Sequence, residues 1–184
     1  MKRYMSVAGS FYPARAVELE RYFEHFSETY DEQTSLPKAK SKAVIVPHAG
    51  YVYSGFTANI AYRVLKNSDV KNFVVIGASH RVVVDGISLG DYEVYETPFG
   101  DINRADGLYE KLKEKFSLVC IEAAHSEHST EVQFPFIKEY MNDVNIVEIV
   151  YSDARADDIS DIIDFVLEQE DCGVIISTDL SHFY

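Results

Sequence analysis

Three short apolar runs in this chain resemble strands, and a histidine follows each of them. The runs and their histidines are 43–46 with His48, 73–76 with His80, and 173–176 with His182. In open α/β sheets the ligand crevice lies outside the carboxyl ends of parallel strands, so residues far apart in sequence meet there. We therefore expect the three imidazoles to share one site. Imidazoles gathered in this way indicate metal binding or acid–base chemistry.

Helical and strand-like segments alternate along the rest of the chain. Helices are expected at 14–30, 54–66, 103–115, 129–141 and 156–168, with Ser54 capping the second and Pro135 starting or interrupting the fourth. Strands are expected at 43–46, 72–76, 118–121 and 145–150 and in a last run ending at Ser177, with a weaker strand or hairpin over 86–97. The alternation predicts a three-layer α/β/α sandwich around a mainly parallel or mixed sheet, in one domain of residues 1–184.

The charge and composition of the chain argue against some classes of binding partner. The chain has 17 basic and 30 acidic side chains, a formal net charge of -13, which repels phosphate backbones and anionic lipids. We therefore expect neither nucleic acid nor membrane partners. No apolar run reaches the roughly 20 residues of a membrane span, and the first residues lack the apolar core of a signal peptide, so the expected location is the cytoplasm. Cys120 and Cys172 form no CxxC motif and are expected to be free thiols.

The first two histidines lie in segments that suit a metal site. Pro47 ends the first strand, so His48 lies at its carboxyl end. His80 occupies the same place one βαβ unit later, on a strand that we expect to be its neighbour in the sheet. A metal commonly takes two imidazoles together with a carboxylate or thiolate. Ser79 as a nucleophile is a weaker interpretation, because Arg81 stands where a GxSxG elbow needs glycine.

Other histidines and acids have more than one interpretation. Glu127 stands where the chain enters a helix, so capping explains it, whereas His128 is a candidate acid–base residue. His125, on the same loop, and His25, among the polar positions of the first helix, are expected to be exposed. After the last strand, Asp179 either ligates a metal or orients a histidine, and His182 is a second acid–base candidate.

Several segments, in one order along almost the whole chain, resemble the Memo family, known in prokaryotes as the protein B component of the AmmeMemoRadiSam group. The matching segments are Ala8 to Pro13, Val46 to Tyr51, Gly77 to His80, Thr97 to Gly100, Glu127 to Phe136 and Ser177 to His182. The resemblance implies a fold similar to LigB-type class III extradiol dioxygenases, whose iron sits among histidines and a carboxylate. It also implies that His48 and His80 match the family's two metal-ligating histidines.

One family feature is absent from this chain. Family members continue beyond the Ser-x-Asp-x-Ser-His segment and supply a cysteine ligand, the family's third, from that later region. We therefore expect the chain to lack the family's C-terminal part. Cys172 precedes the last strand and does not match that ligand. Asp179, His182 or water would then complete the site.

These observations favour a metal-binding protein with a redox-linked role. Imidazole and thiolate ligands suit iron or copper, with zinc as a third candidate. One alternative is a non-haem iron extradiol-type dioxygenase acting on an aromatic substrate, with His128 or His182 as the acid–base residue. Another is a peptide- or partner-binding module without catalysis, whose partners by family resemblance would be radical-SAM and AMMECR-like proteins.

Overall fold

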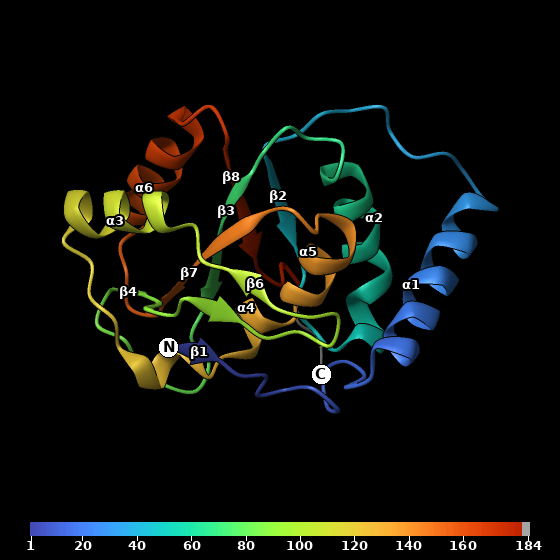
Figure 1. Cartoon of the computed structure of the whole chain (residues 1–184), viewed down its shortest axis with the longest axis horizontal. Coiled ribbons are helices and arrows are strands. Elements are labelled where there is room, and N and C mark those ends of the chain that lie inside the picture. The colour runs from blue at the N-terminus through green and yellow to red at the C-terminus, as the bar shows by residue number, and fades with distance from the viewer. Residues whose placement is uncertain (182–184) are drawn as a thin grey trace.

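The computed structural model describes residues 1–181, so His182 lies outside the described residues. A five-stranded sheet forms the centre of the molecule (Figure 1), in the order β2-β8-β3-β7-β4. Its strands are β2 (Ala43–Val46), β8 (Cys172–Ser177), β3 (Asn72–Ala78), β7 (Asn145–Tyr151) and β4 (Ile87–Leu89). The first four run parallel, and β4 pairs antiparallel with β7 at one edge. This is the mainly parallel, mixed sheet that the sequence predicts.

Helices cover both faces of the sheet, as the alternating pattern requires. On one face lie α1 (Ala16–Asp31), α2 (Phe56–Leu65) and α5 (Phe134–Tyr140), and on the other α3 (Asp106–Phe116) and α6 (Ala156–Glu168), as Figure 1 shows. Successive side chains of a strand point to opposite faces. Accordingly, Phe73 and Val75 of β3 pack in the first core, and Val74 and Ile76 in the second. The chain is therefore a three-layer α/β/α sandwich.

A smaller sheet lies beside the main one. It consists of β1 (Lys2–Arg3), β5 (Val94–Tyr95) and β6 (Ile102–Asn103), with β5 in the middle. The hairpin suggested for 86–97 is wrong, because β4 joins the main sheet and β5 joins the small one. The turn after it is confirmed: Thr97 and Gly100 exchange backbone hydrogen bonds, and Gly100 has a φ of 110°, which glycine adopts without strain.

Three further expectations need correction. Residues 118–121 form no strand, because only Val119 makes a bridge, to Ser88. Ser54 does not cap α2: it lies in a π-helical turn, Tyr51–Gly55, and its hydroxyl donates to the Ala49 carbonyl. The parallel strands β2 and β3 share a sheet but are not neighbours, since β8 lies between them.

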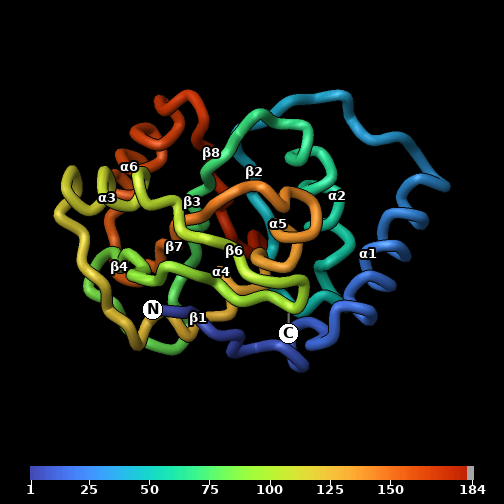
Figure 2. Tube along the Cα trace, viewed as in Figure 1, coloured from blue at the N-terminus to red at the C-terminus, as the bar shows by residue number. Residues whose placement is uncertain are grey.

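The expected helix 129–141 is two helices. They are α4 (His128–Glu131) and α5, with Pro135 in the first turn of α5, where its missing N–H leaves no helical hydrogen bond unmade. A 3-10 turn, Glu122–His125, precedes them. An extended connection over 32–42 returns from α1 to β2 (Figure 2). Within the described residues, no helix is both long and apolar enough to cross a bilayer.

Candidate metal centre

Three histidines form a cluster at the carboxyl edge of the sheet. His48 follows β2, His80 follows β3, and His128 begins α4. One ring nitrogen from each lies within 4.8 Å of the others, and the ring centroids are 4.6 to 5.4 Å apart. The parallel strands bring His48 and His80 together as expected. His128, predicted as an acid–base residue, joins the same cluster and is a third candidate ligand.

Ser177, at the end of β8, sets the tautomer of His48. The Ser177 hydroxyl donates its one proton to the Ser129 carbonyl and accepts a hydrogen bond from Gln133 Nε2. His48 Nδ1 lies 3.1 Å from the same oxygen. Because a hydroxyl has a single proton, Ser177 must accept from His48, so Nδ1 carries the hydrogen. The lone pair of His48 is then on Nε2.

Glu127 sets the tautomers of the other two rings. Its Oε1 lies 3.1 Å from His80 Nδ1 and 2.8 Å from His128 Nδ1. An ionised carboxylate only accepts hydrogen bonds, so both rings carry their hydrogen on Nδ1. In the neutral form of each ring, as in His48, the lone pair is then on Nε2. All three imidazoles therefore have the tautomer that offers Nε2 to a metal, each held through its second nitrogen.

The ionised state of Glu127 follows from its hydrogen bonds. Burial on its own would raise the pKa of Glu127, but hydrogen bonds from His128 and from the backbone N–H groups of His80 and Ser129 outweigh it and hold that pKa far below its usual range. The capping role expected from the sequence is confirmed, since Ser129 N–H donates to the Glu127 side chain at the start of α4. The contact with two histidines has no sequence signal, because His80 is distant in the chain.

Asp179 lies beside His48, on the loop after β8. Its Oδ1 accepts the His48 backbone N–H at 2.7 Å, and its Oδ2 lies 3.7 Å from His48 Nε2. Burial lowers the pKa of His48, and neighbouring His80 and His128 lower it further, whereas Asp179 opposes the shift. A lowered pKa keeps the imidazole neutral and able to bind a metal. Asp179 is thus placed to fix the His48 loop and to offer an anionic oxygen nearby.

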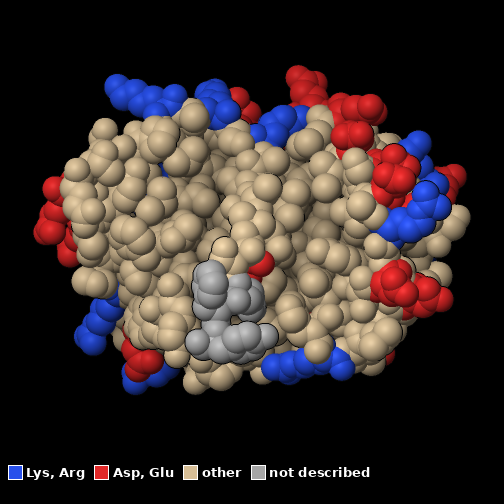
Figure 3. All heavy atoms as spheres, turned by 180° about the vertical axis from the view of Figure 1, so that it is seen from behind, with Lys and Arg blue, Asp and Glu red and all other residues tan. Residues whose placement is uncertain are grey.

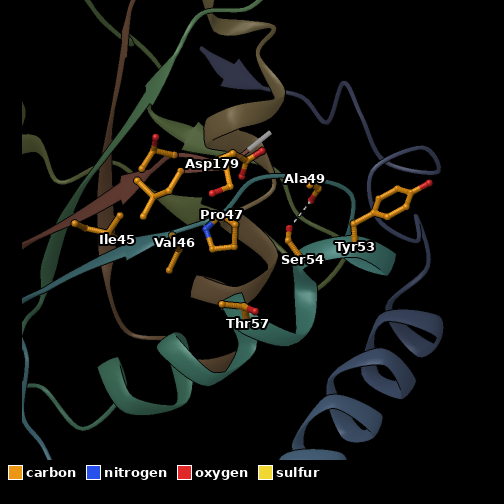
Figure 4. A pocket seen from close by; sticks show the side chains of 11 residues that line it. Ile45, Val46, Pro47, Ala49, Tyr53, Ser54, Thr57 and Asp179 are labelled. Atoms are coloured by element: carbon orange, nitrogen blue, oxygen red, sulfur yellow. Dashed lines mark hydrogen bonds between the residues drawn. The ribbon is translucent and has the colours of Figure 1, made fainter. Parts of the chain in front are cut away.

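A groove adjoins His48. It has a volume of about 750 Å³ and is lined by residues next to His48, among them Pro47, Ala49 and Asp179. Figure 4 shows Asp179 near Pro47 at the end of β2, while Tyr53 points away from the other labelled side chains. Tyr53 and Leu180 are largely exposed. None of the three histidines lines the groove, which reaches the cluster through Asp179 and the two residues that flank His48 in the chain.

His125 is buried, contrary to the expectation that it is exposed. Its Nδ1 lies 2.9 Å from Glu148 Oε2 and its Nε2 lies 2.8 Å from Ser88 Oγ. The order serine, histidine, carboxylate matches that of a catalytic triad, but none of these three side chains is reached by solvent. Their role is structural. By contrast His25 is exposed, as predicted.

Ser79, Cys120 and Cys172 do not join the histidine cluster. The Ser79 hydroxyl donates to the Val82 carbonyl within a turn. Cys172 begins β8, at the strand end opposite the site, and burial is the main reason that its thiol has a pKa of about 11. Cys120 is exposed, and both thiols are free, as expected.

The N-terminal segment covers His128, which the sequence alone did not indicate. The Phe11 ring stacks on the His128 ring, with centroids 4.5 Å apart and planes 28° apart. Glu131, buried in α4, anchors this segment: it accepts hydrogen bonds from Ser6, Val7 and the Tyr12 hydroxyl. Residues 6–12 are thereby fixed against the helix that carries His128.

Together, the sandwich fold and this cluster define an α/β protein with a candidate metal centre at the carboxyl edge of a mainly parallel sheet. Comparison with protein families makes the assignment specific. The chain belongs to the Memo family: the model described as Memo-like protein matches residues 3–184.

Similar proteins occur in distant organisms. A MEMO1 family protein of Thermoplasma acidophilum is 35% identical over 100% of this chain and 68% of its own length. One from Aquifex aeolicus is 34% identical over 97% of this chain and 66% of its own length. A memo-1 homologue of Caenorhabditis elegans is 30% identical over 98% of this chain and 53% of its own length. The chain thus spans between half and about two thirds of these relatives.

Proposed function

We propose that this protein binds a transition metal ion through His48, His80 and His128. The observation that carries the proposal is the shared tautomer of the three rings. Each Nδ1 lies 2.8 to 3.1 Å from an oxygen, so each ring in its neutral form has its lone pair on Nε2, and one nitrogen of each ring lies within 4.8 Å of the others. Neutral imidazoles suit iron, copper and zinc, whereas hard cations such as magnesium prefer oxygen ligands.

Iron and copper are the leading candidates, and either would make the protein redox-linked. Asp179 lies near His48 Nε2, so a mixed set of imidazole nitrogen and carboxylate oxygen supports iron(II). Binding through imidazoles alone favours copper(I) or zinc. The cysteine that the family resemblance implies as a ligand is no part of the cluster among residues 1–181. The set of imidazoles with a carboxylate and the set of imidazoles alone differ in Asp179. An Asp179→Asn variant therefore distinguishes them, since it should weaken metal binding only in the first case.

Anaerobic titration tests the proposal. We expect the wild-type chain to bind one equivalent of iron(II) or copper(I), and a His48→Ala, His80→Ala double variant to lose that binding. The matched control is His25→Ala, which removes an exposed imidazole on α1. Loss of binding in the control, or retained binding in the double variant, would contradict the proposal.

A single His128→Ala variant decides between two roles for that residue. If His128 is a ligand, the variant lowers the metal affinity. If it is an acid–base residue, the affinity stays and only turnover falls. Its ring is 85% covered, and Phe11 stacks on it, so a reactant would approach mainly from the side of the cluster.

A second candidate function is an iron-dependent dioxygenase of the extradiol type. The groove that Asp179 helps to line supports it, since an aromatic substrate needs an open, partly apolar surface near the metal. Bound iron would supply the oxygen chemistry, while His128 would hold or move a proton of the substrate hydroxyl. Oxygen uptake by the iron-loaded protein with a panel of catechols tests this candidate, and no uptake would count against it.

Family membership also supports a role beside partner proteins. The partners would be a radical-SAM protein and an AMMECR-like protein, bound with or without chemistry at the cluster. A capture experiment with each candidate separates the two cases. Capture that is unchanged by His48→Ala would favour a binding role independent of the metal.

A further inference from the structure

We propose that Glu127 is the positioning residue of the histidine cluster, and that its one carboxylate fixes the orientation and the tautomer of His80 and His128 together. The part of this inference that concerns metal affinity rests on the proposed function. The part that concerns the tautomers does not, because it describes the protein before any metal binds.

Both carboxylate oxygens of Glu127 face N–H groups. Its Oε1 faces three N–H groups, those of His80 Nδ1, His128 Nδ1 and the Ser129 backbone, at 2.8 to 3.2 Å. Its Oε2 accepts the His80 backbone N–H at 2.6 Å. Four donors therefore converge on one carboxylate, three of them on Oε1. The two backbone N–H groups can only donate, which favours the ionised carboxylate.

The main chain of Glu127 is fixed as firmly as its side chain. Arg3, in strand β1, donates from Nη2 to the Glu127 carbonyl at 3.1 Å, and the side chain caps α4 through Ser129. The carboxylate is almost fully covered, since the side chain is 1% exposed. Because this carboxylate is buried and its main chain is also hydrogen-bonded, it fixes the orientation of the two imidazole rings that it contacts.

An amide in place of this carboxylate cannot satisfy the same neighbours. With its oxygen at the position of Oε1, glutamine would point N–H₂ at the His80 backbone N–H, and two donors would face each other. With the amide turned round, N–H₂ would face the Nδ1 atoms of His80 and His128 and the Ser129 N–H. Both rings would then have to move their hydrogen to Nε2, which removes the lone pairs from the cluster.

Nitrogen-15 NMR of histidine-labelled protein tests the proposal without metal. At about pH 8, above the ordinary histidine pKa near 6.5, the spectra distinguish protonated from unprotonated ring nitrogens. We expect His80 and His128 to carry hydrogen on Nδ1 in the wild type. A hydrogen on Nε2 of either ring in the wild type would overturn the proposal, whether or not any variant folds.

Two variants and a matched control sharpen the test. Glu127→Gln should change the tautomers of His80 and His128 if its N–H₂ group faces their Nδ1 atoms. In the other orientation it should instead shift the His80 backbone amide resonance, because two donors then face each other. Glu127→Asp, which keeps a carboxylate, should retain the tautomers. The control is Glu148→Gln, which makes the same change at another buried glutamate bonded to a histidine Nδ1, that of His125. Folded Glu127→Gln with unchanged tautomers and an unchanged His80 backbone amide resonance would contradict the proposal, and so would a tautomer change of His80 and His128 in the control.

Metal titration then links position to affinity. Loss of a group that orients a metal ligand typically weakens binding about 10- to 100-fold. We expect a loss of that size in Glu127→Gln and a smaller loss in Glu127→Asp, measured with cobalt(II) by its visible spectrum. If the wild type binds no metal while the tautomers respond as expected, the proposed function fails and the positioning role of Glu127 stands.

Discussion

His48 and His80 each follow a parallel strand, yet different residues hold them. His48 relies on a neutral hydroxyl of β8, that of Ser177, whereas His80 relies on the charged Glu127. Charged acceptors make the stronger hydrogen bonds. The orientation of His80 is therefore expected to depend on charge, and that of His48 on the packing of β8 against β2.

Buried Glu148 predicts how stability depends on pH. Burial would raise the pKa of Glu148, but His125 and Arg3 lower it below its ordinary value of 4.5. Since the folded-state pKa is the lower one, the stabilisation is present above about pH 4.5 and is lost as the pH falls through the folded value. Urea unfolding between about pH 7 and about pH 3 should show the wild type losing its advantage over Glu148→Gln. An advantage that grows towards low pH would contradict this.

At the residue scale, prediction from sequence succeeded where a general rule of topology applies. The convergence of His48 and His80 follows from the carboxyl ends of parallel strands, whichever neighbours those strands have. The burial of His125 does not follow from any such rule, because it depends on contacts with Glu148 and Ser88 that form only in the folded chain. The position of His125 in a loop predicted an exposed side chain, but its hydrogen bonds to buried partners hold it in the interior.

At the scale of elements, α4 is the part that carries the site most directly. It is a single turn, packed on β3 at Gly77, and it begins with His128. A Cβ at position 77 would lie 2.9 Å from Thr130 Cγ2 and closer still to Ser129 Oγ. Glycine is therefore needed there for the close approach of helix and strand.

The variant Gly77→Ala tests this packing. It should push α4 away from β3, cost about 1–3 kcal/mol in the free energy of unfolding, and weaken metal binding by displacing His128. Gly107→Ala is the control: it lies in α3, where an added Cβ meets nothing within 4 Å, so stability should stay or rise by up to about 1 kcal/mol. Equal effects of both variants on metal binding would contradict the argument.

The helices and the long strands were predictable because their apolar patterns are strong. Helix α6 has the predicted bounds, and β3 and β7 differ only at their ends. The short elements could not be predicted, because a few residues are too few to show a helical or alternating pattern of apolar side chains. Residues 118–121 have the composition of a strand, but Val119 is largely exposed, and the last place at that edge of the sheet belongs to β4.

At the scale of the whole molecule, Arg3 joins the small sheet to the site. From β1 it donates to Glu131 at 2.7 Å and to the Glu127 carbonyl, and its Nε lies 3.9 Å from Glu148. These charges are buried, whereas on the face seen in Figure 3 the charged side chains of the surface lie mainly towards the margin. The N-terminal strand is thus held by a buried ionic network, in addition to the more exposed ion pairs of Lys2 with Glu96 and Asp101.

Removing Arg3 should destabilise the whole fold. Arg3→Ala leaves Glu131 and Glu148 buried without their cation, which typically costs about 3–5 kcal/mol. Arg15→Ala is the control, because its pair with Glu18 is exposed and such pairs contribute about 0–1 kcal/mol. Urea unfolding of both variants measures the difference, and a loss for Arg3→Ala no larger than that for Arg15→Ala would refute the role of the network.

The three rings are held by one connected set of hydrogen bonds. Glu127 joins His80 to His128 at the start of α4, and Ser177 joins His48 to the same helix, because its hydroxyl also bonds the Ser129 carbonyl. A displacement of α4 would therefore disturb all three imidazoles at once, so the cluster is expected to keep its shape or lose it as a whole.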